Sequence, residues 1–140
     1  MTLSYFIGDL LEIEQGYYLA HSISGDFSLG AGIAAQINKN YDMVEKLEYF
    51  HLHSPNCWRA LLVDNVFNLV VKNEISAKPT YEALETALYD MKRQAEFLRI
   101  KKIAIPKLCC GRDGLDWTKV ESLIYEVFDD VDISILVVTR

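Results

Sequence analysis

Two side chains in separate loops, a lysine and an aspartate, have the chemistry of a candidate active site. Lys78 precedes Pro79, which we expect at the first position of a long helix. A residue before proline avoids the α region, so Lys78 is extended and points out of the helix. The positive end of the helix dipole opposes an ammonium charge there and favours the neutral, nucleophilic amine. The alternative interpretation is a solvated surface lysine.

Asp113 lies in the loop "IPKLCCGRDGLDW", residues 105–117. Gly111 and Gly114 in this loop permit a nest of backbone N–H groups that can hold a diphosphate. A carboxylate repels a phosphate, so anion binding does not explain Asp113. Two interpretations stay open: a general acid/base beside a bound ligand, or a turn-forming aspartate that bonds its own backbone.

A second glycine-rich stretch, "GDFSLGAGIA" at residues 25–34, lies where a strand ends and a helix begins. Glycine lets a ligand approach the backbone closely. A helix N-terminus offers free N–H groups and a positive dipole end, which suit a phosphate. The alternative is a tight strand-to-helix turn without a ligand.

Apolar periodicity and chain breakers predict the elements that position these loops. Apolar runs predict strands at residues 4–9, 17–24, 101–106 and 132–139, and a hairpin of two strands around Asp64 and Asn65. Apolar residues at helical spacing predict helices at residues 29–39, 41–50, 79–98 and 118–128, the last with a capping box formed by Thr118 and Glu121. Because strands and helices alternate, we expect one domain, residues 1–140, with a three-layer α/β/α architecture and a mixed six-stranded sheet. Ligands of such folds bind beyond the carboxyl ends of the strands, where these loops lie.

The composition argues against several other classes of protein. The chain of 140 residues is 51% hydrophobic and 24% charged, which suits a globular domain. Its net charge of −6 disfavours a general attraction to nucleic acid or to an anionic membrane. The apolar runs are short and no basic region precedes one, so we expect neither a signal peptide nor a membrane-spanning helix. Three cysteines, two of them adjacent, form no disulfide framework and indicate a cytoplasmic setting.

The histidines offer a weaker candidate for function. "HLHSPNC" contains His51, His53 and Cys57, but a fourth zinc ligand is missing, so we expect no metal site. His21 lies in an apolar strand, where we expect a hydrogen-bonded core histidine. No cofactor is expected.

Four motifs, taken together, resemble a macrodomain: "IGDLL", "LAHSISGDFSLGAGIA", "AKPTYEAL" and "IPKLCCGRDGLDW". More narrowly, they are similar to the terminal ADP-ribose protein glycohydrolase branch, which removes ADP-ribose from glutamate. The resemblance runs from about Phe6 to the C-terminus, with the motif order and spacing of that branch. The sequence departs from the family pattern at Cys109, where glycine is expected, and at Arg140, which replaces an apolar residue.

The resemblance implies a role for each loop. Contacts to the adenine would come from Asp9 and Leu10. The distal ribose and one phosphate would be wrapped by Ser24, Leu29, Gly30, Ala31, Gly32 and Ile33. The other side of the diphosphate would be lined by Leu108, Cys109, Cys110, Gly111 and Arg112. Lys78 would attack the anomeric carbon of the distal ribose, and Asp113 would be the acid/base that helps to resolve the lysine adduct.

The resemblance implies an ADP-ribosyl hydrolase that needs no metal. Its substrates would be ADP-ribose esters of acidic side chains, with O-acetyl-ADP-ribose as a further substrate. Its partners would be ADP-ribose and ADP-ribosylated protein, and we expect a monomer that binds no membrane.

Three alternatives stay open. A DNA ADP-ribosyl hydrolase of the antitoxin type would use a basic rim of Lys72, Lys78 and Arg112 to hold ADP-ribosylated single-stranded DNA, although that branch typically lacks an acid at position 113. A non-catalytic ADP-ribose reader would need neither Lys78 nor Asp113. A structural domain that has lost the ligand is the third.

Overall fold

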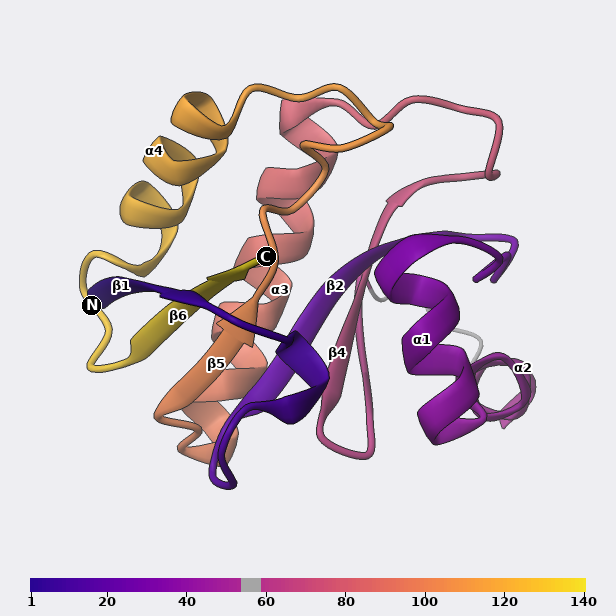
Figure 1. The fold of residues 1–140 in the computed structure, drawn as a ribbon, viewed down its shortest axis with the longest axis horizontal. Helices are drawn as coiled ribbons and strands as arrows, with labels where there is room; N and C mark the ends of the chain where they lie inside the picture. Colours follow the sequence, from indigo (N-terminus) through magenta and orange to yellow (C-terminus); the bar gives the residue numbers. More distant parts are fainter. Residues whose placement is uncertain (54–58) are drawn as a thin grey trace.

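The computed structural model describes residues 1–53 and 59–140, with helices on both faces of a central sheet (Figure 1). The described residues form the strands β1 (Thr2–Ile7), β2 (Tyr18–Ser24), β3 (Ala60–Val63), β4 (Val66–Lys72), β5 (Lys102–Ile105) and β6 (Ser134–Thr139). Their helices are α1 (Gly32–Tyr41), α2 (Met43–His53), α3 (Tyr81–Leu98), α4 (Trp117–Phe128) and a short 3₁₀ helix, η1 (Leu10–Glu12). The expected α/β/α class is confirmed.

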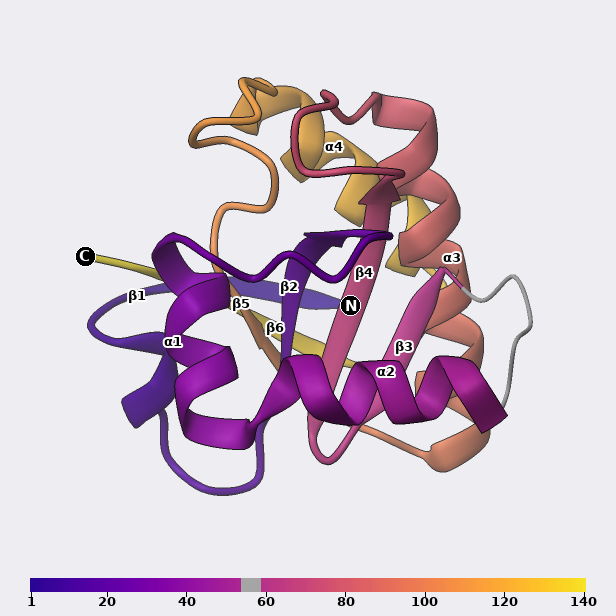
Figure 2. The same cartoon turned by 90° about the vertical axis from the view of Figure 1, so that its right-hand side faces the viewer.

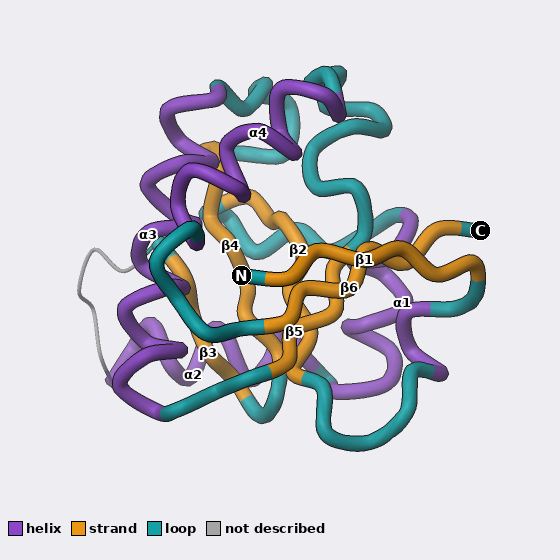
Figure 3. The backbone as a smooth tube through the Cα atoms, turned by 90° about the vertical axis from the view of Figure 1, so that its left-hand side faces the viewer, coloured by secondary structure: helices purple, strands orange, loops and turns teal. Residues whose placement is uncertain are grey.

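The strands form one mixed six-stranded sheet in the order β1-β6-β5-β2-β4-β3. Every neighbouring pair is parallel except β3 and β4, which form the predicted antiparallel hairpin. Figure 3 follows the strands through the sheet between the helical layers. Because β2, β4 and β5 run in the same direction, the loops that follow them leave the sheet at one edge. These three loops are the predicted ligand-binding loops.

Helices α1 and α2 lie on one side of the strands (Figure 2), and two apolar cores, one on each face of the sheet, hold the helices to it. Phe67 of β4 and Phe128 of α4 are fully buried in the core beneath α3 and α4. Val66 of β4 and Ile37 of α1 lie in the core beneath α1 and α2. Complete burial of such a side chain contributes about 1.5–3 kcal/mol, so the sheet is a rigid base for its loops. No helix in the described part of the chain has the length and apolar character needed to cross a membrane.

A β-bulge changes the register of β2 against β4 close to the loops. Ile23 pairs with Val70, but the next residue, Ser24, pairs with Lys72. A bulge redirects side chains and increases local twist. Ser24 and Lys72 therefore leave the sheet side by side.

The start of α3 differs from the prediction. The helix begins at Tyr81, with Thr80 as its N-cap; the Thr80 hydroxyl accepts from the N–H of Ala83 at 3.1 Å. Pro79 therefore precedes the cap, and its placement at the first helical position was wrong. A threonine oxygen satisfies a free N–H of the first turn, which proline cannot do.

The starts of α4 and α1 also differ. Asp116 is the N-cap of α4 and its carboxylate accepts from the N–H of Thr118 at 3.2 Å. The predicted capping box of Thr118 and Glu121 was therefore wrong, because an aspartate two residues earlier already supplies the acceptor. Helix α1 begins at Gly32 rather than at residue 29, because Ala31 is extended.

Candidate active site

A cavity of about 680 Å³ opens at the edge of the sheet where β2, β4 and β5 end. The end of β2 and the three loops that follow these strands line it, as the sequence predicts. Most of the predicted site residues lie on its wall: Ser24, Gly30, Ala31, Gly32, Ile33, Lys78, Leu108, Cys109, Gly111, Arg112 and Asp113. A concave site of this size suits a small molecule.

A smaller cavity of about 180 Å³ lies beside the first one, and Asp9 and Leu10 line it as predicted. Gly32 and Ile33 line both cavities. The two spaces therefore meet at the N-terminus of α1. An elongated ligand can pass from one to the other across this helix end.

The N-terminus of α1 has the features of an anion site. Its N-cap, Ala31, has no side chain that accepts from the first turn. Those N–H groups stay available for a phosphate. Gly32 has a positive φ of 59°, and a Cβ at Gly30 or Gly32 would meet no protein atom within 4 Å. These glycines border open space, where a side chain would occupy room that a ligand needs.

The β5–α4 loop, residues 106–116, makes the opposite wall. Cys109 has a positive φ of 62°, a conformation that costs a residue with a Cβ about 1–2 kcal/mol. This explains why glycine suits the position in the family pattern. The side chain is 5% exposed and packs in the core beneath α3 and α4, and burial raises the pKa of its thiol to about 12.

Two predicted ligand-binding residues face elsewhere. Leu29 is 5% exposed and packs in the core beneath α1 and α2. The Cys110 thiol donates to the carbonyl of Leu108 at 3.2 Å, and desolvation raises its pKa. Both side chains help to hold the shape of their loops.

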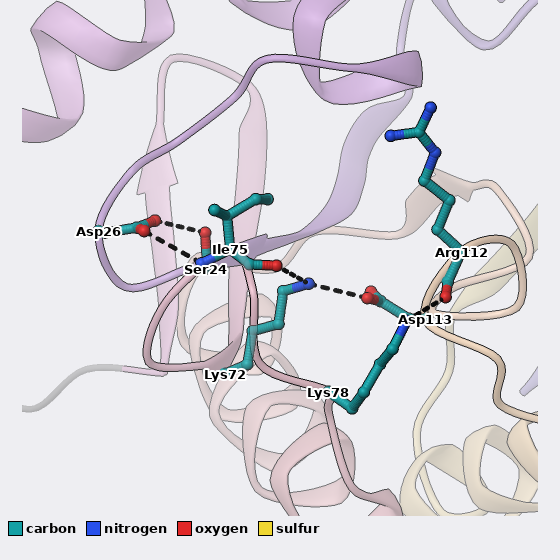
Figure 4. A network of polar contacts seen from close by, with 7 residues as sticks. All are labelled: Ser24, Asp26, Lys72, Ile75, Lys78, Arg112 and Asp113. Carbon is teal, nitrogen blue, oxygen red and sulfur yellow. Dashed lines mark hydrogen bonds and ion pairs between the residues drawn. The ribbon is translucent and has the colours of Figure 1, made fainter.

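The structure brings the two candidate catalytic residues to one side of the cavity (Figure 4). Lys78 Nζ donates to the backbone carbonyl of Arg112 at 2.6 Å. Arg112 is the residue before Asp113, so the amine of Lys78 lies close to the loop segment that carries the carboxylate. The sequence separates Lys78 from Arg112 by 34 positions.

Lys72 has a role that sequence reasoning missed. It was predicted only as part of a basic rim, but its Nζ forms an ion pair with Asp113 Oδ1 at 2.8 Å. The same Nζ donates to the carbonyl of Ile75 at 3.2 Å. The pair joins residues 41 positions apart, and only the strand register places them together.

Asp26 links two of the loops. Its Oδ1 accepts from the Ser24 hydroxyl at 2.5 Å and from the N–H of Ser28 at 3.1 Å. Its Oδ2 accepts from the N–H of Ile75 at 3.0 Å. The Ser24 hydroxyl, followed by the Ile75 N–H, lowers the pKa of Asp26 below its usual value. The acid in the glycine-rich stretch thus fixes the β4–α3 loop, residues 73–80, to the β2–α1 loop, residues 25–31.

Asp9 in the smaller cavity has two different partners. Oδ1 accepts from the N–H of Leu11 at 2.9 Å and caps η1. Oδ2 lies 3.4 Å from a guanidinium nitrogen of Arg140, which also lies 3.3 Å from Gln36 Oε1. Arg140, which departs from the family pattern, therefore spans the cavity from Asp9 to α1.

The structure confirms the expectation that His21 is a hydrogen-bonded core residue. His21 is 2% exposed, and its Nε2 lies 2.6 Å from Asn68 Oδ1. Burial lowers its pKa to about 4, so it is a neutral core residue. Cys57 of the candidate zinc cluster lies outside the described residues, and the rings of His51 and His53 pack on Phe27 and Tyr49. Within residues 1–53 and 59–140, no three His, Cys, Asp or Glu residues are arranged to hold a metal.

The chain is similar in sequence to proteins named as ADP-ribosyl-hydrolysing enzymes. No family model matches the chain. Human ADP-ribose glycohydrolase OARD1 is 35% identical over 139 residues, which cover 98% of this chain and 91% of the human protein. A DNA ADP-ribosyl glycohydrolase of Mycobacterium tuberculosis is 27% identical over 148 residues, covering 93% of this chain and 40% of that protein.

The fold comparison gives the class of the domain. The macrodomain of Mycobacterium tuberculosis DarG superposes with a TM-score of 0.88 at 24% identity, covering 99% of this chain and 98% of that one. The fold is therefore that of a macrodomain. With its 35% identity to OARD1, the chain belongs to the family of macrodomain ADP-ribose glycohydrolases, as its motifs predict, and is a hydrolase that acts on ADP-ribose.

Proposed function

We propose that this hydrolase removes ester-linked ADP-ribose from acidic side chains of proteins, with Lys78 as nucleophile and Asp113 as acid/base. One observation carries the proposal: Lys78 Nζ lies 2.6 Å from the carbonyl oxygen of Arg112, the neighbour of Asp113. A nucleophile needs a proton-transfer group close by. Here both groups lie in the cavity that the glycine-rich loops enclose.

The proposed reaction has two steps. The neutral amine of Lys78 attacks the anomeric carbon of the distal ribose, and the bond to the ester oxygen breaks, so its electron pair leaves with the protein carboxylate. Once the C–N bond has formed, the nitrogen is positively charged, and Asp113 takes a proton from it. Water then adds to the same carbon, and Asp113 returns its proton to nitrogen as the C–N bond breaks. The water keeps one hydrogen in the new hydroxyl group and releases one proton to solvent.

The binding part of the proposal uses backbone groups. The first-turn N–H groups of α1 lack a capping side chain and would donate hydrogen bonds to one phosphate. The smaller cavity beside Asp9 would take the adenine, because it meets the larger one at Gly32 and Ile33. This pose places the distal ribose near Lys78.

The test compares release of ADP-ribose from glutamate-ADP-ribosylated protein and from ADP-ribosylated single-stranded DNA. We expect the wild type to release it from protein. Lys78→Ala should abolish turnover while its Kd for ADP-ribose stays within about threefold, since the amine acts on the transition state. Lys46→Ala, a change of a lysine paired with Asp64 on the surface, is the control and should leave turnover unchanged. Unchanged turnover in Lys78→Ala would remove the covalent mechanism.

A second candidate is hydrolysis of ADP-ribosylated DNA. The 27% identity to a DNA ADP-ribosyl glycohydrolase favours it, and Lys107 and Arg112 on the cavity wall would meet a phosphate backbone. Release from DNA alone in the same assay would establish this substrate. Binding of ADP-ribose without release from either substrate would indicate a reader.

A further inference from the structure

The ion pair of Lys72 and Asp113 is far more enclosed than an ordinary surface pair. Its side chains are 9% and 19% exposed, whereas those of Lys46 and Asp64 are 42% and 45% exposed. Water and salt screen an exposed pair, but they weaken an enclosed one much less. The contact at 2.8 Å therefore holds the Asp113 carboxylate in one place.

Lys72 is itself held from two directions. It ends β4, where the bulge sets it beside Ser24. Its Nζ also donates to the carbonyl of Ile75, and the N–H of Ile75 donates to Asp26. Figure 4 shows this chain of contacts from Asp26 to Asp113. The ammonium is thus fixed by the sheet edge and by the loop that Asp26 secures.

The loop of Asp113 needs such support. Gly111 and Gly114 flank the aspartate, and a Cβ at either would meet no protein atom within 4 Å. The glycines therefore contribute no side-chain packing to hold the loop. A general acid must stay within hydrogen-bond reach of the proton it transfers, and a functional side chain on a loop depends on supporting contacts. Lys72 supplies that contact from the end of a buried strand.

We propose that Lys72 is a positioning residue that holds Asp113 in place for the reaction, with Asp26 supporting Lys72 through Ile75. This inference rests on the proposed role of Asp113. Lys72 is not the nucleophile, because its Nζ is enclosed and donates to a carboxylate and a carbonyl. Both lysines line the cavity, but the Lys78 Nζ donates to a neutral backbone carbonyl, whereas the Lys72 Nζ is paired with a carboxylate.

A double-mutant cycle tests this role through kcat and KM for glutamate-linked ADP-ribose. Lys72→Met should lower kcat about 10- to 100-fold, part of what a general acid/base supplies, with KM within about threefold. In an Asp113→Ala background Lys72→Met should lower kcat no further, because residues acting through one group are not additive. Intact mass should show a lysine adduct, of the mass of ADP-ribose less water, accumulating in Lys72→Met.

Two further variants separate positioning from nucleophilic attack and from folding. Lys72→Arg should recover most of the lost kcat, because a guanidinium pairs well with a carboxylate; a nucleophilic lysine would not be replaced by arginine. Asp26→Ala leaves the buried charge pair intact and should lower kcat about 3- to 10-fold, again only when Asp113 is present. It serves as the test if Lys72→Met fails to fold. Lys46→Met, which breaks the exposed pair, should change nothing.

The outcomes distinguish a failure of the positioning role of Lys72 from a failure of the proposed function. Lys78-dependent release by the wild type with unchanged kcat in Lys72→Met would overturn the role of Lys72 alone. Equal losses with and without Asp113, or a loss of ADP-ribose affinity that accounts for the whole effect, would also overturn it. No release by the wild type from protein would overturn the proposed function and the role of Lys72 with it.

Discussion

The two ends of the proposed ADP-ribose cavity are built differently. The reactive end, which we define by Lys72, Lys78 and Asp113, contains an ion pair whose side chains are 9% and 19% exposed. The base end, defined by Asp9 and Arg140, contains a looser pair at 3.4 Å with side chains 34% and 65% exposed. One end joins the end of β4 to the β5–α4 loop through an enclosed ion pair, and the other joins two side chains that are more exposed.

This difference predicts what each end controls. Exposed ion pairs contribute about 0–1 kcal/mol, so the base end can open and close around a ligand at little cost. Removing one partner of an enclosed pair leaves an uncompensated charge and costs much more. We therefore expect changes at the reactive end to alter the rate and changes at the base end to alter affinity.

The largest effect should come from the reactive end. Asp113→Ala removes the acid/base and should lower kcat about 10²- to 10⁴-fold, with little change in the Kd for ADP-ribose. Single-turnover kinetics and calorimetry measure the two quantities. A loss of affinity equal to the loss of rate would mean that the two ends are not functionally separate.

The stability of the fold should depend on pH through His21, which lines the larger cavity. His21 is buried with a pKa of about 4, below its ordinary value of 6.5, so the unfolded chain binds more protons between these values. Its contribution to stability is therefore complete above about pH 6.5 and is lost as the pH falls towards 4, by about 3 kcal/mol in total.

Denaturant titrations of the wild type and of His21→Gln at pH 7 and pH 4.5 measure this contribution. The wild type should lose more unfolding free energy than the variant between the two values. Equal losses would show that His21 does not make the free energy of unfolding depend on pH.

The base end should respond through affinity. Asp9→Asn keeps the oxygen that caps η1 but replaces the other acceptor with an amide donor. We expect ADP-ribose to bind about tenfold more weakly, because a donor would face the adenine amine, while ribose 5-phosphate binds as before. Arg140→Ala should change either Kd by no more than about twofold. A lower kcat with unchanged Kd in Asp9→Asn would contradict the separation.

The smallest effect concerns Cys109 in the β5–α4 loop. Cys109→Gly and Cys109→Ala both remove the buried thiol, but only glycine relieves the positive φ of 62°. Cys109→Gly should therefore be the more stable of the two by about 1 kcal/mol. Thermal unfolding of both proteins measures it, and equal stability would mean that the loop relaxes around a Cβ.

Local patterns were enough to predict the layers of the fold and the loops of the site. Alternating apolar runs and helical spacing predicted the elements, and the position of the loops after strands predicted the cavity edge. The predicted roles of Pro79 and Thr118 at the helix starts were wrong, because Thr80 and Asp116 cap these helices instead. Several neighbouring residues compete for the capping position of a helix. Such competition depends on backbone geometry that periodicity does not reveal.

The support of the site was not predictable in the same way. The contacts of Lys72 with Asp113 and of Asp26 with Ile75 join residues 41 and 49 positions apart. They depend on the bulge at Ser24, which shifts the register by one residue. Leu29 illustrates the same limit, because its place beside a glycine loop does not reveal that its side chain turns into the core.

Locating the covalent adduct tests most directly whether Lys78 is the nucleophile. Asp113→Ala should be mixed with glutamate-ADP-ribosylated protein, digested and analysed by tandem mass spectrometry. The adduct should have the mass of ADP-ribose less water and should be attached to Lys78. An adduct on Lys72, or release by the wild type with no adduct on any lysine of the variant, would contradict it.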